Sequence, residues 1–318
     1  MLTLAKIQAA KRKLAPYIYE TPIIRLQGLD EVLGCIVYIK AENMQKTNSF
    51  KLRGALNKML AMPIEQLQKG VVAASSGNHG KGVAYAARLL NIHATIVLPD
   101  TAPIIKVEGI RALGANVVQC KLAERHVITE RLSSENGYSI IHPYDDFDIM
   151  AGQGTAGLEI LAQLPDVNTI VVPIGGGGLI SGIATAIKSL APHVKVIGAE
   201  PAAISRYAKS LQANERLLLE EQQSVADALL TLQPGERNFP IVQKLVDEVV
   251  SVDEGSLHNG MQTLLLEGKI LAEPSSSIGI GAALQGILPI SKKEIVCFLI
   301  SGGNVGLNQL INLKGAVK

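Results

Sequence analysis

Short apolar runs rich in Val and Ile alternate with stretches of helical periodicity from about residue 70 onward. Runs of this kind are typical of strands in parallel sheets, which are buried on both faces by the helices between them. We expect strands at Val71–Ser75, Ala94–Pro99, Ala115–Cys120, Tyr138–His142, Thr169–Ile174, Val194–Ala199 and Glu294–Ile300. The pattern predicts an α/β fold with open, mostly parallel twisted sheets flanked by helices.

The intervening segments predict helices, several of them with small residues on the packing face. The expected ranges are Gly80–Leu90, Pro103–Leu113, Leu122–Glu135 and Ile180–Leu190, with an amphipathic helix at the N-terminus. We expect Lys121–Asn136 and Gln212–Gln223 to be solvated helical faces. The β/α pattern divides near Asp145–Gly154, which favours two sheets in two domains over one very large sheet.

Composition narrows the function classes. The 318 residues are 47% apolar and 18% charged with a net charge of +2, which suits a large folded core. Only 4 Phe, 7 Tyr and no Trp are present, and no long basic run, so we expect no nucleic-acid partner. No apolar stretch is long enough to span a bilayer, and Cys35, Cys120 and Cys297 form no metal or disulfide pattern. We therefore expect a cytoplasmic protein with no membrane partner.

Two glycine-rich segments stand where strands are expected to end, the position at which ligands bind in open α/β sheets. Ser75–Gly80 (SSGNHG) places hydroxyls, an amide and an imidazole at a helix start, which suits a carboxylate. An ordinary strand–helix turn is the alternative. Gly175–Gly178 offers successive bare N–H groups at a helix N-terminus, which suits a phosphate. Because Ile180 stands at the sixth position of the segment that starts at Gly175, this segment is neither a Walker A loop nor a full GxGxxG motif.

Two further features are less specific taken alone. Ser301–Asn304 (SGGN) follows the last predicted strand, where a hydroxyl could bind a ligand ring. Lys51 lies between Phe50 and Leu52. An apolar setting would lower the pKa of its amine and make it nucleophilic, although most lysines are solvated surface residues.

Five motifs in this order resemble the fold-type II pyridoxal-phosphate enzymes, and among them the short serine/threonine dehydratases and serine racemases. The motifs are KTNSFKLRGA, SSGNHG, AGQGT (Ala151–Thr155), PIGGGGL and SGGN, with HPYDD at His142–Asp146 as a further likeness. The resemblance implies a tryptophan-synthase-β-like fold. It also implies a large cofactor-binding domain from residues 1–69 and 146–318 and a small substrate-carboxylate domain from residues 70–145.

The resemblance assigns roles residue by residue. Lys51 would bind pyridoxal 5'-phosphate as a Schiff base and then act as base on the substrate Cα–H. Phe50 would pack near the cofactor ring, Asn78 would bind the ring 3-oxygen, and Ser301 would face the pyridine nitrogen. The phosphate would lie on the backbone of Gly175, Gly176, Gly177, Gly178 and Leu179. The substrate would be bound by Ser75, Ser76, Gly77, Asn78, His79 and His142, with Ser76 also able to protonate the opposite face in a racemase.

The implied activity is dehydration and deamination of L-threonine or L-serine to a 2-oxo acid and ammonia, in a homodimer or homotetramer. Alternatives are a serine or aspartate racemase with side eliminase activity and a 3-hydroxyaspartate or hydroxyectoine-pathway dehydratase. A non-catalytic protein that binds a phosphorylated ligand is a further one.

The sequence departs from the family pattern at three places. Asn48 stands where glycine is usual, and Val225–Ala228 ends in ADA where ADG is usual. Arg206 occupies the position of an aspartate that joins the equivalent of Glu200 in metal-activated relatives. A lone carboxylate is a poor site for Mg²⁺ or Ca²⁺, so we expect no metal ion.

Overall fold

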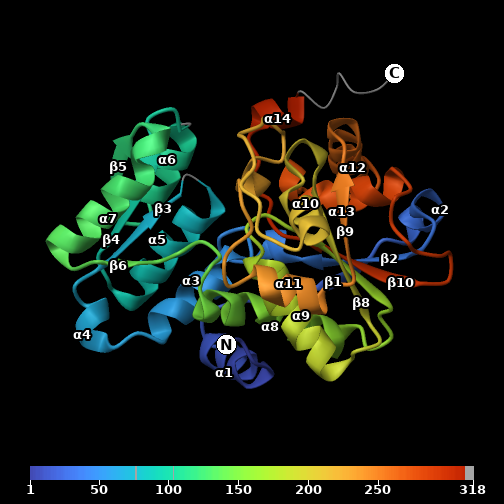
Figure 1. The fold of residues 1–318 in the computed structure, drawn as a ribbon, viewed down its shortest axis with the longest axis horizontal. Coiled ribbons are helices and arrows are strands. Elements are labelled where there is room, and N and C mark those ends of the chain that lie inside the picture. Colours follow the sequence, from blue (N-terminus) through green and yellow to red (C-terminus); the bar gives the residue numbers. More distant parts are fainter. Residues whose placement is uncertain (76, 103, 312–318) are drawn as a thin grey trace.

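The computed structural model describes residues 1–75, 77–102 and 104–311. It contains two sheets (Figure 1). In spatial order, the six-stranded sheet consists of β1 (Ile23–Arg25), β2 (Ile36–Ala41), β10 (Ile295–Ile300), β7 (Thr169–Pro173), β8 (Lys195–Pro201) and β9 (Glu248–Val252). The four-stranded sheet consists of β5 (Asn116–Cys120), β4 (Ala94–Pro99), β3 (Val71–Ala74) and β6 (Ser139–Ile140). All neighbouring strands are parallel except β1 and β2, which confirms the predicted fold class.

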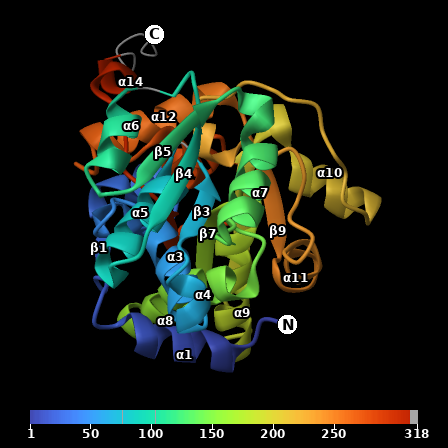
Figure 2. The same ribbon diagram turned by 90° about the vertical axis from the view of Figure 1, so that its left-hand side faces the viewer.

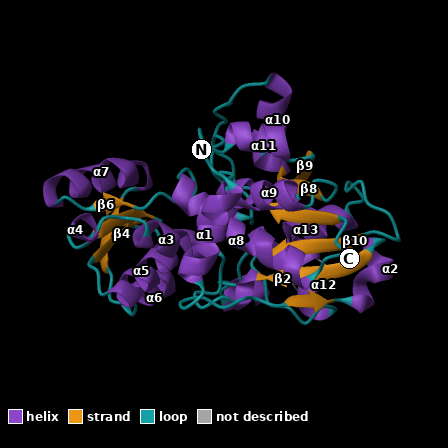
Figure 3. Cartoon of the chain, turned by 90° about the horizontal axis from the view of Figure 1, so that it is seen from below, coloured by secondary structure: helices purple, strands orange, loops and turns teal. Residues whose placement is uncertain are grey.

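The helices lie on both sides of the two sheets (Figure 3). The first seven are α1 (Leu4–Leu14), α2 (Asp30–Leu33), α3 (Lys51–Leu60), α4 (Ile64–Leu67), α5 (Asn78–Leu90), α6 (Ile104–Arg111) and α7 (Arg125–Asn136). The remainder are α8 (Phe147–Gln163), α9 (Gly178–Leu190), α10 (Arg206–Ala213), α11 (Phe239–Leu245), α12 (Glu254–Leu266), α13 (Pro274–Leu284) and α14 (Leu307–Ile311). Among these described helices, none is both long and apolar enough to cross a membrane.

Alternation along the strands of the six-stranded sheet builds a core on each face. Val171 and Phe298 point to the face covered by α13, whereas Ile170, Cys297 and Leu299 point to the face covered by α8 and α9. Strands buried on both sides carry no polar alternation, which is why they appear in the sequence as continuous apolar runs.

The four-stranded sheet is covered by α5 and α6 on one side and by α7 on the other (Figure 2). Val71 and Ile96 pack on the first side, together with Leu52 and Leu56 of α3, whereas Val72 and Val97 face α7. The helix that begins at Lys51 therefore packs against the smaller sheet although it precedes that sheet in the chain. The domain boundaries near residues 70 and 145 stay a prediction.

Two predicted elements are wrong in extent. The strand expected over Tyr138–His142 is reduced to two residues, because the chain turns at His142, whose ring accepts the N–H groups of Tyr144 and Asp145. The helical face expected over Gln212–Gln223 ends at Ala213, because Asn214 has a left-handed φ of 57°. The segment after Asn214 is an irregular loop. Strands β1, β2 and β9 were not predicted.

Candidate active site

Lys51 is the first residue of α3 and follows a loop that is bonded to the chain beyond β10. The N–H of Phe50 donates to the carbonyl of Ser301 at 3.0 Å, and the N–H of Gly303 donates to the carbonyl of Asn48 at 2.9 Å. Asn48 has a φ of 56°, a left-handed conformation that asparagine tolerates better than most residues. The position of Lys51 is thus set by two segments about 250 residues apart in the sequence.

Lys51 is half-buried, and its amine is partly removed from bulk water. Nζ donates to the carbonyl of Pro143 at 2.8 Å and lies 5.1 Å from the centroid of the Phe50 ring. Burial lowers the pKa of Lys51 to about 8, and the carboxylate of Glu273 opposes this shift. A larger share of the amine is therefore neutral near pH 7 than in an exposed lysine, and the neutral amine is the nucleophile.

The four glycines Gly175–Gly178 connect β7 to α9 and present free backbone donors. In the described part of the chain, none of their N–H groups has a hydrogen-bond partner. Gly177 has a φ of 103°, so successive N–H groups can point to one side. Together with the positive end of α9, they form an anion receptor whose donors suit a phosphate.

Side chains of the protein itself exclude a Cβ at three of these glycines. A Cβ at Gly176 would overlap the ring of Tyr144, and one at Gly177 would overlap the hydroxyl of Tyr207. At Gly178 it would lie 2.8 Å from Oε1 of Gln153. The run of glycines is therefore required by close packing around the turn as well as by access to its N–H groups.

Gln153 belongs to the AGQGT segment but had no predicted role. It lies in α8, only 1% exposed, between Gly54 of α3 and Gly178 of α9. Neither its amide nitrogen nor its amide oxygen has a hydrogen-bond partner among the described residues. A buried amide without partners is costly, which points to a polar ligand at this edge of the glycine turn.

Asn78 and Ser301, predicted as cofactor ligands, are connected by a buried polar network. Asn78 donates to Oε1 of Glu273 at 2.6 Å, and the hydroxyls of Ser276 and Ser301 are 2.9 Å apart. Ser276 Oγ is also 3.4 Å from Glu273 Oε1 and accepts the N–H of Gly302 at 2.7 Å. The network connects the start of α5, beside the smaller sheet, with the end of β10 in the larger sheet.

Glu273 was missed in the sequence although it is buried at the centre of this network. Burial raises the pKa of its carboxyl to about 7, with Asp227 as a further cause and the Asn78 hydrogen bond opposing the shift. Its only sequence signal is an acidic residue directly before Pro274, a pattern that is too common to identify a site.

The two predicted histidines are both held in place by the backbone. His79 Nε2 is 2.7 Å from the carbonyl of Ile141, and burial lowers the pKa of His79 to about 3. His142 Nδ1 accepts the N–H groups of Tyr144 and Asp145, and burial lowers the pKa of His142 to about 4. Both rings are neutral near pH 7. Because Nδ1 of His142 is an acceptor, its proton is on Nε2.

The loop before α5 supplies the other predicted substrate contacts. Ser75 Oγ accepts the N–H of Gly77 at 3.3 Å, and both residues are half-buried. Gly77 precedes α5, and a Cβ built there would meet nothing within 4 Å. Ser76 lies outside the described residues, so its predicted role stays a prediction.

Two residues stand at the positions of the cation site of metal-activated relatives. These residues, Glu200 and Arg206, are paired with each other and with the backbone. Glu200 accepts the N–H groups of Tyr207 and Ala208 at 2.9 and 2.8 Å, and its carboxylate lies 3.8 Å from the Arg206 guanidinium. In the described ranges, no group of three or more His, Cys, Asp or Glu side chains could hold a metal ion.

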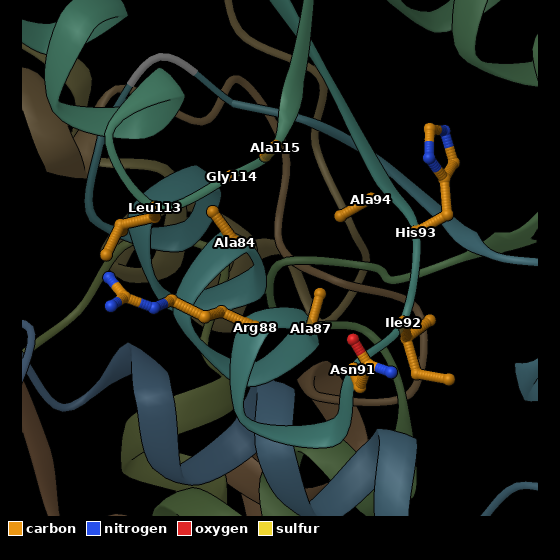
Figure 4. Close-up of a pocket in the computed structure, with 10 residues that line it drawn as sticks. All are labelled: Ala84, Ala87, Arg88, Asn91, Ile92, His93, Ala94, Leu113, Gly114 and Ala115. Atoms are coloured by element: carbon orange, nitrogen blue, oxygen red, sulfur yellow. The ribbon is translucent and has the colours of Figure 1, made fainter.

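A pocket of the smaller sheet lies apart from all of these residues (Figure 4). It is lined by Ala87 and Arg88 near the C-terminal end of α5 and by His93 and Leu113 beyond it, whereas Asn78 is at the other end of the helix. None of the predicted site residues lines it.

The fold and the site together define a class of protein. A half-buried lysine of lowered pKa binds the carbonyl of Pro143, and the next residue, Tyr144, packs on an amide-lined turn at the carboxyl end of a parallel strand. This is the arrangement of an α/β enzyme with a phosphorylated carbonyl cofactor. The family model described as "Pyridoxal-phosphate dependent enzyme" matches residues 14–302. The chain belongs to this family, and its cofactor is pyridoxal phosphate.

Individual relatives agree with this assignment. The chain is 41% identical to the L-threonine ammonia-lyase of Thermotoga maritima, over 100% of this chain and 80% of that protein. Maize serine racemase superposes with a TM-score of 0.94 at 36% identity, covering 99% of this chain and 97% of the other. The processed form of threonine deaminase isoform 2 from Solanum lycopersicum superposes with a TM-score of 0.93 at 36% identity, covering 99% of this chain and 87% of the other.

The residues present fit the cofactor. The unpartnered N–H groups of Gly175–Gly178, counted among the described residues, match a phosphate, and the Lys51 amine of lowered pKa matches an aldehyde. The amide of Gln153, which has no partner in the same part of the chain, marks the same edge of the site.

Proposed function

We propose that this protein converts L-threonine or L-serine to the 2-oxo acid and ammonia, by elimination of water followed by hydrolysis of the resulting enamine. The observation that carries the proposal is the Lys51 amine at the start of α3, which has a lowered pKa and donates to the Pro143 carbonyl, together with the free backbone donors of Gly175–Gly178 among the described residues. The 41% identity to an L-threonine ammonia-lyase over the whole chain supports the substrate class.

In this proposal each predicted cofactor ligand keeps its role. Lys51 binds the cofactor covalently, Gly175, Gly176, Gly177, Gly178 and Leu179 bind its phosphate, and Phe50 packs near its ring. Asn78 binds the ring 3-oxygen, and Ser301 faces the ring nitrogen. When bound, the cofactor withdraws electrons from the Cα of an attached amino acid and so makes its proton removable.

Lys51 is the base that takes this proton. Its lowered pKa supports the role, because a base works best when its pKa is near the working pH. The Cβ–O bond then breaks, and the hydroxyl leaves as water with the proton that Lys51 took from Cα. The released enamine takes up one water to give the oxo acid and ammonia, so the atoms balance.

Ser301 tunes how strongly electrons are withdrawn. A hydroxyl that already shares a hydrogen bond with Ser276 is a weak partner for the ring nitrogen and leaves it uncharged, whereas a carboxylate would favour the protonated form. Ser301 would in this way favour a substrate that loses its β-hydroxyl promptly once the Cα proton is removed.

The substrate carboxylate binds at the start of α5. Gly77, Asn78 and His79 place N–H groups at the positive end of that helix, and Ser75 adds a hydroxyl just before it. His142 contributes its Nε2–H from the loop that also carries the Lys51 partner Pro143. We further propose a cytoplasmic homodimer or homotetramer, which sedimentation of the purified protein would test.

The experiment is a panel of L-amino acids assayed for ammonia and oxo acid, with visible absorbance and borohydride trapping on the same preparation. We expect turnover of L-threonine or L-serine and a trapped cofactor on Lys51. Lys51→Ala should lower kcat by at least about 10⁴-fold, because it removes both the attachment point and the base. A colourless protein, or a label on another lysine, would support a non-catalytic phosphate binder instead.

Serine racemisation is the second candidate, favoured by the 0.94 TM-score with maize serine racemase. It needs a proton donor on the face opposite Lys51, and Ser76 is the residue proposed for it. Ser76→Ala should then abolish formation of D-serine while sparing oxo-acid formation from L-serine. Equal loss of both products would contradict this two-base scheme.

A further inference from the structure

Arg206, the first residue of α10, is fully buried and binds the backbone around the glycine turn. All three guanidinium nitrogens donate to carbonyl oxygens: Nε to Gly175 at 3.1 Å, Nη1 to Ile204 at 2.7 Å, and Nη2 to Ile174 at 2.8 Å and Leu229 at 2.6 Å. Nη1 also lies 3.8 Å from the carboxylate of Glu200. A guanidinium has five N–H donors, and four of them are used on carbonyls here.

Burying the Arg206 charge costs free energy of folding, so we expect the side chain to have a further role in positioning its partners. A buried charge loses its hydration, and burial lowers the pKa of Arg206 while Glu200 raises it. Pairing with Glu200 does not by itself explain why Arg206 is buried, because that carboxylate already accepts the N–H groups of Tyr207 and Ala208. The proposed elimination does not use Arg206 either.

The carbonyls that Arg206 binds determine where the N–H groups of the turn point. In a trans peptide the carbonyl and the following N–H point in opposite directions. Because the carbonyls of Ile174 and Gly175 face Arg206, the N–H groups of Gly175 and Gly176 face the other way.

Tyr207 extends the same pattern by one peptide. Its hydroxyl donates to the carbonyl of Gly176 at 2.8 Å, so the N–H of Gly177 is turned in the same manner. These are the N–H groups that have no partner among the described residues. Two successive residues of α10 thus hold three successive peptides of the turn.

We propose that Arg206 is a positioning residue whose guanidinium is a built-in cation that aims the Gly175–Gly177 amides at the cofactor phosphate. This rests on the proposed function in one respect, namely that the phosphate binds at this turn. Arg206 acts through the peptides and touches no reacting atom. It also joins the turn to Leu229, the last residue of the short 3-10 helix Asp227–Leu229.

The test measures the contribution of the phosphate to binding separately from that of the rest of the cofactor. The full chain is freed of cofactor and titrated with pyridoxal phosphate and with pyridoxal, which lacks the phosphate. Arg206→Ala should weaken binding of pyridoxal phosphate by roughly 10- to 100-fold, the range for losing hydrogen bonds to a charged group, and leave binding of pyridoxal unchanged. The ³¹P resonance of the bound phosphate should broaden or shift.

Chemical rescue tests the charge. Guanidinium chloride at non-denaturing concentration should restore binding of pyridoxal phosphate to Arg206→Ala, whereas urea, its neutral counterpart in shape, should not. The matched control is Arg25→Ala, since Arg25 also binds a carboxylate and a carbonyl, those of Asp30 and Val37, but touches no glycine of the turn. It should bind both ligands as wild type does.

Several results would overturn the proposal: equal weakening for both ligands, unchanged binding of pyridoxal phosphate, or rescue by urea as effective as by guanidinium. If Arg206→Ala does not fold, Arg206→Lys tests the proposal instead, because lysine keeps the positive charge but has fewer N–H donors. It should show the same selective loss to a smaller degree, and an unchanged affinity ratio would contradict the proposal. Failure of the proposed function looks different, since wild type itself would then not bind pyridoxal phosphate at Lys51.

Discussion

The two glycine-rich turns that follow β3 and β7 differ in how the protein surrounds them. At Gly77, after β3, a Cβ would meet nothing within 4 Å. At Gly176 and Gly177, after β7, a Cβ would overlap Tyr144 and Tyr207. In the second turn, Arg206 donates a hydrogen bond to the carbonyl of Gly175. In the first turn, the N–H of Gly77 donates to the hydroxyl of Ser75 at 3.3 Å.

This contrast matches what each turn is proposed to bind. A cofactor phosphate stays for many turnovers, so a preformed receptor loses little ordering entropy when it binds. A substrate carboxylate must enter and leave in every turnover, which suits the space beside Gly77. Gly80 of the same segment is closely packed, since a Cβ there would overlap the carbonyl of Ser75, so the open space is confined to the entry of the turn. Packing density, rather than the number of glycines, therefore separates a fixed receptor from an adaptable one.

The largest expected effect comes from adding one methyl group to each turn. Gly177→Ala should lower the free energy of unfolding by about 2–4 kcal/mol, because it forces Tyr207 to move and requires alanine at a φ of 103°. Gly77→Ala should change it by no more than about 1 kcal/mol and alter KM for the substrate instead. Chemical denaturation of both holoenzymes and steady-state kinetics measure the two effects.

Gly114→Ala is the control for Gly177→Ala, since Gly114 has a positive φ of 88° but open space around its Cβ position. It isolates the backbone strain from the overlap. If Gly77→Ala destabilised the protein as much as Gly177→Ala, the contrast between the turns would be lost.

A second prediction concerns the pH dependence of cofactor uptake. If the phosphate turn is preformed, reaction of the Lys51 amine limits the rate at which the cofactor-free protein takes up pyridoxal phosphate. Only the neutral amine reacts, and burial lowers its pKa to about 8. The rate should rise about tenfold per pH unit below that value and level off above it. Stopped-flow absorbance measures it, and a midpoint near the ordinary lysine pKa of 10.5 would show that the amine is not desolvated.

The smallest expected effect involves Glu273, which contacts Asn78 beside the first turn and acts on Lys51 through its charge. Because this carboxylate raises the pKa of Lys51, Glu273→Gln should move the midpoint of the uptake profile to lower pH. The shift should be modest, since burial raises the pKa of Glu273 to about 7 and part of it is already uncharged near neutrality. Glu267→Gln, at an exposed position of the same half of the chain, should leave the midpoint in place. If Glu273→Gln moved the midpoint to higher pH, the Glu273 carboxylate would not be the group that raises the pKa of Lys51.

The sequence by itself determined the fold class and the main candidate residues. Strands buried on both faces leave continuous apolar runs, and the strand predicted at Ala94–Pro99 has those same bounds in the structure. Short or edge strands such as β1 and β6 carry little such pattern, because few of their residues are buried on both sides. The Gly175–Gly178 turn was predicted because four consecutive glycines are unusual, whereas the role of Lys51 was predicted from the family motifs and not from its local setting.

Only the tertiary structure decided which side chains surround these candidates. Glu273, Gln153 and Arg206 come from three separate helical segments, and nothing local to them distinguishes a buried polar contact from a solvated one. The close approach of Tyr144 and Tyr207 to the glycines likewise depends on residues far apart in the chain. Local pattern reports backbone conformation and average burial, whereas contacts between distant segments depend on how the sheets and helices pack, and that packing exists only in the folded chain.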